Sequence, residues 1–426
     1  MKSPTVAIVG SGPSGCYLAQ ALRKEWPHAE ITLFDRMPVP YGLVRYGVAP
    51  DHPGTKNVVR QFERLFERDN IGFAGNVEIG RDIPLDVLRE AYDIVVLATG
   101  LHGDRPLDIP GADQARVYGA GRLTRLLNDH PDEQGFRPRL GETTVIVGNG
   151  NVAIDVLRLL AKSVEEFDNS EITDEVLGRL LATPLRHIHI VGRSPARQAK
   201  FDTLMLRELA GLRRARFDIR DLPEPGGEED KAVAAKLEAL RALKRVGQGE
   251  LDISFHFGWQ PESLNTEEDG YRFRFKATDG SKTSLRLTAD SVITAIGFTQ
   301  QPDSHFCKHG LSRTGADPDA SQLAPGLYCT GWFKRGPTGT IPENRADAKA
   351  VAALILAQAA AMGLGKPGFA ALPAAITGKL VDYAGWKRID AAEVAAAPAG
   401  RIRQKIRDTA EMLRIVNDIH QGEPQS

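Results

Sequence analysis

The most constraining feature of this sequence is a short glycine-rich turn between an apolar strand and a helix, because it occurs twice. Residues 5–9 are small or β-branched and apolar, as expected of a buried parallel strand. Residues 10–15 then read Gly-Ser-Gly-Pro-Ser-Gly and lead into a helical pattern. A second apolar segment over residues 30–34 ends at Asp35. This order predicts a βαβ unit of the dinucleotide-binding type.

Each glycine of the first turn has a mechanical role in such a unit. Gly10 permits the tight turn, Gly12 lets the backbone approach a pyrophosphate, and Gly15 lets the helix pack closely on the strand. Asp35 lies about 20 residues beyond Gly15, where an acidic side chain hydrogen-bonds an adenosine ribose. The first turn is therefore predicted to bind a dinucleotide.

The second turn follows an apolar strand over residues 143–147, and residues 148–153 read Gly-Asn-Gly-Asn-Val-Ala. The next apolar segment, residues 188–191, is followed by Gly192 and Arg193 instead of an acid. A guanidinium suits a 2′-phosphate, which a carboxylate would repel. The second turn is therefore predicted to bind NADP, with a solvated surface arginine as the alternative interpretation of Arg193.

Composition excludes several classes of protein. The chain has 426 residues, enough for two or three domains, and 54 basic against 55 acidic residues leave a net charge of −1. That balance argues against nucleic acid as a partner. No apolar run approaches the roughly 20 residues of a membrane span, and an apolar strand at residue 5 leaves no room for a signal peptide. We therefore expect a cytoplasmic enzyme.

The cysteines also exclude some chemistry. Cys16, Cys307 and Cys329 are far apart and odd in number, so each is expected to be a small buried residue and not part of a disulfide framework or a metal site. The chain has no Cys-x-x-Cys motif for a dithiol relay of the thioredoxin reductase kind, and no cysteine set for an iron–sulfur cluster. If the chain carries a redox cofactor, the electrons that leave it must therefore pass to an external acceptor.

The residues alone thus predict an α/β enzyme with two dinucleotide sites, most simply one for a flavin and one for a nicotinamide. Residues 254–257 and 271–276 alternate apolar and polar side chains, which predicts antiparallel strands of a half-exposed sheet.

Two further segments resemble the adrenodoxin reductase family, which are FAD-containing ferredoxin–NADP reductases with bacterial members. Residues 38–53 read Pro-Val-Pro-Tyr-Gly-Leu-Val-Arg-Tyr-Gly-Val-Ala-Pro-Asp-His-Pro, and residues 331–341 read Gly-Trp-Phe-Lys-Arg-Gly-Pro-Thr-Gly-Thr-Ile. The resemblance is collinear from about residue 6 to residue 348. It implies a glutathione-reductase-like fold with two Rossmann-like domains: an FAD domain from residues 1–103 and 298–426, the second part with C-terminal helices, and an inserted NADP domain from residues 104–297.

The resemblance also implies a set of cofactor contacts. Besides the fingerprint glycines Gly10, Gly12 and Gly15, FAD would contact Ser14, Asp35, Leu43, Ile79, Trp332, and the backbone of Gly339, Thr340 and Ile341. NADP(H) would contact Asn149, Gly150, Asn151 and Val152, with Arg193 at the 2′-phosphate and Gly339 near the nicotinamide. The chain departs from the family at Ser194, where a second arginine is usual, and at Met205, where an acid is usual. Arg197 or Lys200 could replace the missing arginine.

His52 and Glu208 are the two catalytic candidates, because they align with polar residues close to the flavin and nicotinamide in some family members. An imidazole and a carboxylate could hold the nicotinamide geometry or manage protons on the reduced flavin. Hydride transfer itself needs neither group. The alternatives are a histidine that hydrogen-bonds backbone in a Pro-Asp-His-Pro turn and an ordinary surface acid.

The sequence therefore predicts an FAD-dependent ferredoxin–NADP reductase, with hydride transfer between NADPH and FAD and single-electron transfer between FAD and a ferredoxin. One alternative is an NAD(P)H-dependent flavin oxidoreductase, or a flavin subunit, with another acceptor; a second is a flavin-binding protein without turnover. Ferredoxins are typically acidic, so a cationic docking surface is expected. The candidates are Lys200, Arg207, Arg213, Arg214 and Arg216, with Arg207 and Arg214 expected on one helical face.

Overall fold

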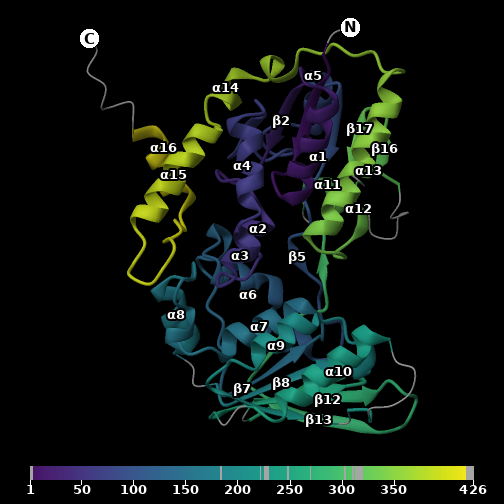
Figure 1. Ribbon diagram of the computed structural model, residues 1–426, viewed down its shortest axis with the longest axis vertical. Coiled ribbons are helices and arrows are strands. Elements are labelled where there is room, and N and C mark those ends of the chain that lie inside the picture. Colours follow the sequence, from purple (N-terminus) through teal and green to yellow (C-terminus); the bar gives the residue numbers. More distant parts are fainter. Residues whose placement is uncertain are drawn as a thin grey trace. The chain divides into compact units, whose positions relative to one another are not determined.

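The computed structural model describes residues 3–182, 185–220, 222–224, 230–246, 249–268, 270–301, 304–308, 311 and 320–418. The chain forms two compact units, Met1–Gly103 with Phe298–Ser426, and Asp104–Gly297 (Figure 1). Each unit is built around a six-stranded sheet with helices beside it. The short strands β5 (Gly103–Asp104) and β15 (Phe298–Thr299) lie where the chain passes from one unit to the other.

The sheet of the first unit has the strand order β16-β17-β4-β1-β2-β3. All neighbours are parallel except β16 and β17. The strands are β1 Thr5–Val9, β2 Glu30–Phe34, β3 Gly72–Ala74, β4 Ile94–Leu97, β16 Gln322–Ala324 and β17 Leu327–Cys329. In register, Val9 pairs with Phe34 on one side and with Leu97 on the other. The carboxyl ends of β1, β2 and β4 therefore lie together, where the first glycine turn leaves β1.

Apolar side chains cover both faces of this sheet. Val6 and Ile8 of β1 belong to one buried cluster, and Ala7 and Val9 belong to another on the opposite face. The alternation explains why the strands are apolar throughout. The helices of the unit are α1 Pro13–Glu25, α2 Leu43–Tyr46, α3 Pro53–Lys56, α4 Val59–Glu67, α5 Leu85–Ala91, α11 His305–Lys308, α12 Trp332–Arg335, α13 Ile341–Ala359, α14 Ala374–Thr377, α15 Tyr383–Ala395 and α16 Thr409–Asn417.

The second unit repeats the arrangement with a wholly parallel sheet of order β6-β14-β7-β8-β10-β9. Its strands are β6 Val117–Gly119, β7 Thr143–Val147, β8 His187–Gly192, β9 Ala215–Ile219, β10 Leu251–Phe257 and β14 Ser291–Thr294. Its helices are α6 Ala120–Leu127, α7 Asn151–Ala161, α8 Asp174–Leu181, α9 Thr203–Leu209 and α10 Lys231–Leu243.

The second unit also contains a separate three-stranded antiparallel sheet. It consists of β11 Trp259–Glu267, β12 Gly270–Ala277 and β13 Ser284–Ala289. Phe273 and Phe275 of β12 share a buried cluster with Val145 and Val147 of β7, which joins the two sheets.

One predicted strand is in a different sheet from the one expected. Residues 271–276 are antiparallel, as expected, but residues 254–257 belong to β10, which is parallel to β8 and β9. Ile253 and Phe255 of β10 are buried, while Ser254 and His256 on the other face are half-buried. The alternation of apolar and polar residues in β10 therefore arises because one face of this strand is partly exposed. It does not indicate whether the strand is parallel or antiparallel to its neighbours.

Candidate dinucleotide sites

The first glycine turn needs glycine at two of its three positions. Gly10 has φ of +113°, and a Cβ atom there would lie 2.4 Å from the carbonyl oxygen of Ala98. A Cβ atom on Gly15 would lie 2.1 Å from the carbonyl oxygen of Gly10. Both distances are far below ordinary contact, so the close packing of α1 on β1 and β4 depends on the absence of these side chains.

Gly12 is the exception, because a Cβ atom there would meet nothing within 4 Å. Gly12 is the N-cap of α1, and no side chain caps this helix. The first intrahelical bond runs from the N–H of Cys16 to the carbonyl of Gly12, at 3.0 Å, so the N–H groups of Ser14 and Gly15 precede the ladder. The space beside Gly12 at this positive end of the helix dipole is open, the arrangement that binds a phosphate.

Four other helices of the chain begin differently. Each of α9, α10, α15 and α16 has an aspartate at the N-cap whose carboxylate accepts a backbone hydrogen bond. An aspartate supplies the negative charge that the end of a helix attracts. At the start of α1 no side chain accepts such a hydrogen bond. A bound anion could take that place.

Asp35 lies at the end of β2, as predicted, and holds the first turn in place. One carboxylate oxygen accepts hydrogen bonds from the N–H of Ser11 at 3.0 Å and from its hydroxyl at 2.5 Å. The other accepts from the N–H of Met37 at 3.0 Å. Asp35 is half-buried. Asp35 thus contacts the glycine turn directly. Its contact with a ribose stays a prediction.

Leu43 lies on a segment that contacts the glycine turn. The N–H of Tyr41 donates to the carbonyl of Ser11 at 3.1 Å, and a Cβ atom on Gly42 would lie 3.2 Å from the Cα atom of Gly12. Leu43 follows at the start of α2 and is 38% exposed. A large exposed apolar side chain beside an open anion site is suited to cover a bound cofactor.

Ser14 and Trp332 are brought together by Gly331. A Cβ atom on Gly331 would lie 2.1 Å from Oγ of Ser14, and Gly331 has φ of +69°. The indole of Trp332 stacks on Phe298 with ring centroids 5.4 Å apart. Its Nε1 atom is buried and has no hydrogen-bond partner among the described residues. A buried N–H without an acceptor is costly in a finished protein, so this site fits a ligand that supplies an acceptor.

An ion-pair cluster holds this segment. The carboxylate of Asp347 on α13 accepts from the hydroxyl of Thr330 at 2.8 Å and from the N–H of Gly331 at 2.7 Å, and pairs with the buried Lys334. Burial by itself would raise the pKa of Asp347, but the hydrogen bonds from Lys334, Gly331 and Thr330 outweigh it and hold that pKa below its ordinary value. Asp347 was not among the predicted site residues.

The remaining predicted FAD contacts differ in their surroundings. The side chain of Ile79 is buried in the core cluster that contains Ala7 and Val9, so it cannot face a ligand, and a contact would have to use its backbone. Gly339 has φ of +87° and precedes Thr340, the N-cap of α13. The N–H of Thr340 already donates to Glu343 at 2.8 Å. Ile341 is the first residue of α13 and is half-buried.

The second glycine turn has the same geometry as the first. Gly148 has φ of +130°, and a Cβ atom there would lie 2.3 Å from the carbonyl oxygen of Ala295. Gly150 is the N-cap of α7, has no side-chain cap, and would have nothing within 4 Å of a Cβ atom. The first intrahelical bond joins the N–H of Ile154 to the carbonyl of Gly150 at 3.2 Å. The N–H groups of Asn151 and Val152 therefore lie at an open helix end.

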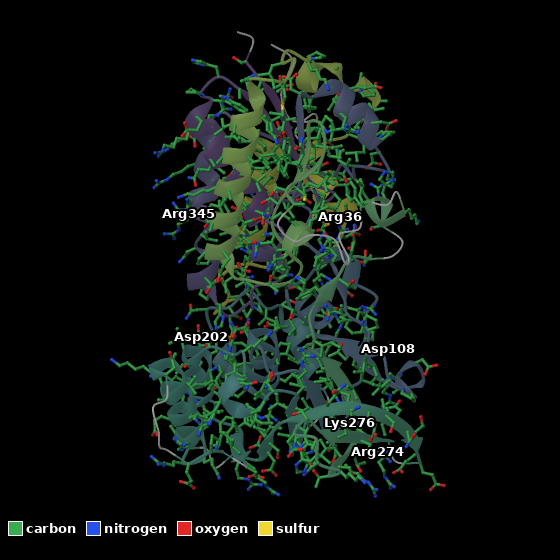
Figure 2. All side chains as sticks on the ribbon, turned by 90° about the vertical axis from the view of Figure 1, so that its right-hand side faces the viewer. Arg36, Asp108, Asp202, Arg274, Lys276 and Arg345 are labelled. Atoms are coloured by element: carbon green, nitrogen blue, oxygen red, sulfur yellow. The ribbon has the colours of Figure 1, made fainter. Side chains whose placement is uncertain are left out.

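Two asparagines fix the segment after β8 against this turn. The amide Nδ2 of Asn149 donates to the carbonyl of Ser194 at 3.5 Å, and a Cβ atom on Gly192 would collide with it. The Oδ1 atom of Asn151 accepts from the N–H of Asp202 at 2.8 Å. Asp202 lies on the surface of the second unit (Figure 2).

Arg193 lies between Gly192 and Ser194 and has an exposed side chain. Its carbonyl accepts a hydrogen bond from the hydroxyl of Thr278 at 3.0 Å, which anchors the backbone. Within the described ranges its guanidinium makes no ion pair. The structure thus places an exposed cation beside the second turn.

The two catalytic candidates belong to different units. His52 is the half-buried N-cap residue of α3 in the first unit, and its N–H donates to the carbonyl of Ala49 at 3.0 Å. Glu208 lies on α9 of the second unit and pairs at 3.5 Å with Arg158, which is buried on α7. Their catalytic roles remain predictions.

The predicted cationic helix face is wrong. Helix α9 ends at Leu209, and Arg214 lies next to β9 instead of on the helix. Arg214 pairs with Glu250 at 2.9 Å and Arg216 pairs with Asp252 at 2.5 Å, so both charges are balanced. Arg207 is exposed on α9.

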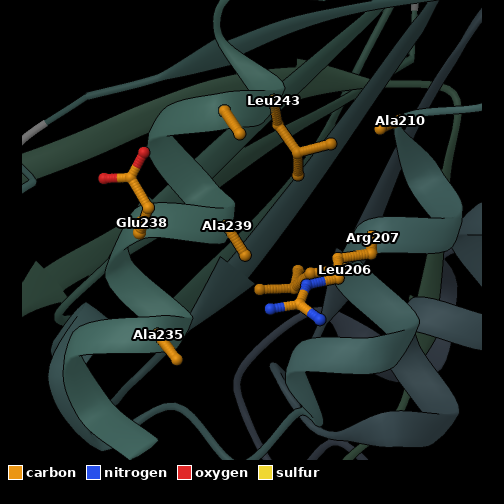
Figure 3. A pocket seen from close by; sticks show the side chains of 8 residues that line it. Leu206, Arg207, Ala210, Ala235, Glu238, Ala239 and Leu243 are labelled. Atoms are coloured by element: carbon orange, nitrogen blue, oxygen red, sulfur yellow. The ribbon is translucent and has the colours of Figure 1, made fainter. Parts of the chain in front are cut away.

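A cavity of about 230 Å³ lies between α9 and α10 (Figure 3). It is lined by Leu206, Arg207, Ala210, Ala235, Glu238, Ala239, Ala242 and Leu243. None of the predicted cofactor contacts lines it. Cys16 and Cys329 are buried, as expected, while the side chain of Cys307 lies outside the described part of the chain. Within the described residues, no helix has the length and apolar character needed to cross a membrane.

Comparison with known proteins relates almost the whole chain to one family. The family model of pyridine nucleotide-disulphide oxidoreductases matches residues 4–189. Cindoxin reductase of Citrobacter braakii is 48% identical over 96% of this chain and 90% of its own length. The mitochondrial NADPH:adrenodoxin oxidoreductase of Homo sapiens is 34% identical over 97% of this chain and 92% of its own length. This chain belongs to the adrenodoxin reductase family.

A solved structure extends the comparison to the fold. Mycobacterium tuberculosis FprA in complex with NADPH is 32% identical, with a TM-score of 0.85 over 98% of this chain and 100% of that chain. The predicted family and the predicted α/β fold with two Rossmann-like domains are confirmed.

Proposed function

We propose that this member of the adrenodoxin reductase family is an FAD-dependent ferredoxin–NADP reductase. FAD binds at the first glycine turn, in the unit Met1–Gly103 with Phe298–Ser426, and NADP(H) binds at the second, in the unit Asp104–Gly297. The observation that carries the proposal is the pair of uncapped helix N-termini, α1 and α7, each with open space where a Cβ atom of its N-cap glycine would lie.

The chain's own residues bind and orient FAD. The N–H groups of Ser14 and Gly15 hold the pyrophosphate at the start of α1. Leu43 covers the cofactor from the side of α2, and Trp332 offers its buried Nε1–H as a donor. Asp347 fixes the backbone of Gly331 and thereby the position of Trp332. Bound FAD would supply the redox chemistry, because a flavin can take up two electrons from NADPH as a hydride and release them singly.

NADP(H) is bound by the start of α7 and by the segment after β8. The N–H groups of Asn151 and Val152 face the pyrophosphate, while Arg193 reads the 2′-phosphate. Gly339, with the backbone of Thr340 and Ile341, is proposed to contact the cofactor rings. His52 is proposed to act beside the flavin and Glu208 beside the nicotinamide, where each holds geometry and neither drives hydride transfer.

The acceptor is proposed to be a small ferredoxin-type protein. Relatives of this chain are named for reducing cindoxin and adrenodoxin, so the family delivers electrons to carrier proteins. The two described cysteines, Cys16 and Cys329, are both buried as thiols, which fits a reducing compartment, and we place the protein in the cytoplasm.

Reduction of cytochrome c tests the proposal. The purified holoenzyme is given NADPH, with and without each of a panel of small iron–sulfur and flavin-containing carriers from the host. We expect a slow basal rate that rises by at least about tenfold when the cognate carrier is added. An enzyme whose flavin is reduced by NADPH, but which accelerates with no carrier, would instead be a flavin oxidoreductase with a small-molecule acceptor.

A further inference from the structure

The second site has only one of the two neighbouring arginines that the family resemblance leads one to expect at the 2′-phosphate. We call the cations that bind this phosphate the phosphate clamp. A phosphate monoester carries a charge of about −1.5 to −2 at neutral pH, so one arginine neutralises only part of it. Ser194, which occupies the place of the second arginine, has no cationic side chain. Another cation at this turn would complete the clamp, and the segment after Ser194 contains two, Arg197 and Lys200.

Lys200 is tied directly to the glycine turn. Its N–H donates to the carbonyl of Asn149 at 3.1 Å. The amide of the same Asn149 donates to the carbonyl of Ser194 at 3.5 Å, and its Nδ2 atom lies where a Cβ atom on Gly192 would be. The neighbours of Arg193 on both sides therefore contact Asn149, and so does Lys200. Asn149 brings the two cations to one turn.

The two residues that flank Lys200 are buried, whereas the side chain of Lys200 is exposed. Ala199 and Phe201, the flanking residues, are each 2% exposed. The ammonium of Lys236 donates to the carbonyl of Ala199 and lies 5.8 Å from the ring of Phe201. Lys200 is exposed between these two anchors.

No acid of the described residues balances Lys200 or Arg193 through an ion pair. The nearest acid in sequence is Asp202, whose carboxylate caps α9 by accepting from the N–H of Leu204 at 3.0 Å. In contrast, Arg214 and Arg216 of the same unit are paired with acids. Two unpaired cations at one uncapped helix end create a positive potential that suits a dianion.

We propose that Lys200 is the second cation of the 2′-phosphate clamp and that, with Arg193, it determines selectivity for NADP(H) over NAD(H). The inference rests on the proposed NADP site at α7. An ammonium on a flexible stem contacts a phosphate as a point charge, whereas a second arginine would bind it bidentately. The clamp of this chain should therefore depend on salt more strongly than a paired-arginine clamp would.

Equilibrium binding to the holoenzyme tests the inference without turnover. The probes are adenosine 2′,5′-bisphosphate and 5′-AMP, measured by isothermal titration calorimetry at low and moderate salt. Lys200→Met removes the charge at similar length and should weaken the bisphosphate about tenfold, with 5′-AMP changed by less than about twofold. Lys200→Arg should retain wild-type selectivity. Lys244→Met is the control, because Lys244 is an exposed lysine at the C-cap of α10, eight residues beyond Lys236, and it should change neither affinity.

Three outcomes would overturn the inference. Lys200→Met could weaken both probes equally, which would make Lys200 a structural residue. Arg197→Met could remove the selectivity while Lys200→Met does not, which would assign the role to Arg197. A wild-type protein that binds the two probes equally would contradict the clamp and also the proposed NADP site, whereas the first two outcomes leave that site intact.

Discussion

The change Gly12→Val separates folding from cofactor binding at the first turn. Gly12 has φ of −72° and ψ of −177°, a conformation open to any residue, and a Cβ atom there meets nothing within 4 Å. Valine should therefore cost the fold only about 1 kcal/mol, through a poorer N-cap. The same side chain would occupy the space in front of the N–H groups of Ser14 and Gly15, where the pyrophosphate is expected.

The size of the effect follows from the hydrogen bonds that valine blocks. Two charge-assisted bonds, at about 1.5–3 kcal/mol each, are worth about 3–6 kcal/mol, or a loss of about 10²- to 10⁴-fold in FAD affinity. The assay is the ratio of flavin to protein after purification, followed by titration of the apoprotein with FAD. Thermal unfolding of the two apoproteins should differ little.

Gly15→Ala is the matched control in the same turn. Its Cβ atom would lie 2.1 Å from the carbonyl oxygen of Gly10, so the helix must shift, and overpacking of this kind costs about 1–3 kcal/mol or more. Gly15→Ala should thus lower the stability of the apoprotein more than Gly12→Val does. A Gly12→Val protein purified with its full complement of FAD would refute the assignment of this turn.

Three further predictions concern single side chains. Arg193→Ala should weaken NADPH binding by roughly 10- to 50-fold while NADH changes little; equal weakening of both would mean that Arg193 does not read the phosphate. Asp347→Asn leaves Lys334 buried without its charged partner and should cost about 3 kcal/mol at pH 7 by urea denaturation. Because the pKa of Asp347 is lowered in the folded state, the difference in free energy of unfolding between wild type and variant should shrink as the pH falls below about 4, the ordinary aspartate pKa. A difference that stays constant with pH would contradict the ion pair. Burial and the neighbouring His256 and His187 lower the pKa of His189 to about 4, so its NMR titration should have a midpoint near that value. As the pH falls from about 6.5 to 4, the unfolded state takes up the proton first, and the free energy of unfolding should therefore decrease. A His189 titration near pH 6.5 would show that the ring is solvated.

The parts of the fold that were predicted correctly follow from local rules. The turns at Gly10 and Gly148 require positive φ angles, and the apolar strands before them are covered on both faces. The direction of β10 could not be predicted, because alternation of Ile253 and Phe255 with polar neighbours is the same in a parallel strand with one partly exposed face. Strand direction depends on connections that span the whole unit.

The predicted sites were incomplete where residues distant in sequence meet. The bond from Gly331 to Asp347 joins two segments sixteen residues apart, and nothing in the sequence separates Asp347 from the exposed acids of other helices. The end of α9 could have been found, because Gly211 lies two residues beyond Leu209 and glycine is a common helix stop. A helix that ends near Gly211 cannot contain Arg214.

Anaerobic reduction of the flavin followed by reoxidation tests the central claim most directly. The holoenzyme is mixed with equimolar NADPH, and the visible flavin absorbance is followed before and after an oxidised ferredoxin is added. We expect the absorbance to bleach with NADPH, much more slowly with NADH, and to return as the ferredoxin becomes reduced. A flavin that NADPH fails to bleach, or a reduced protein that no ferredoxin reoxidises, would contradict the proposed reductase.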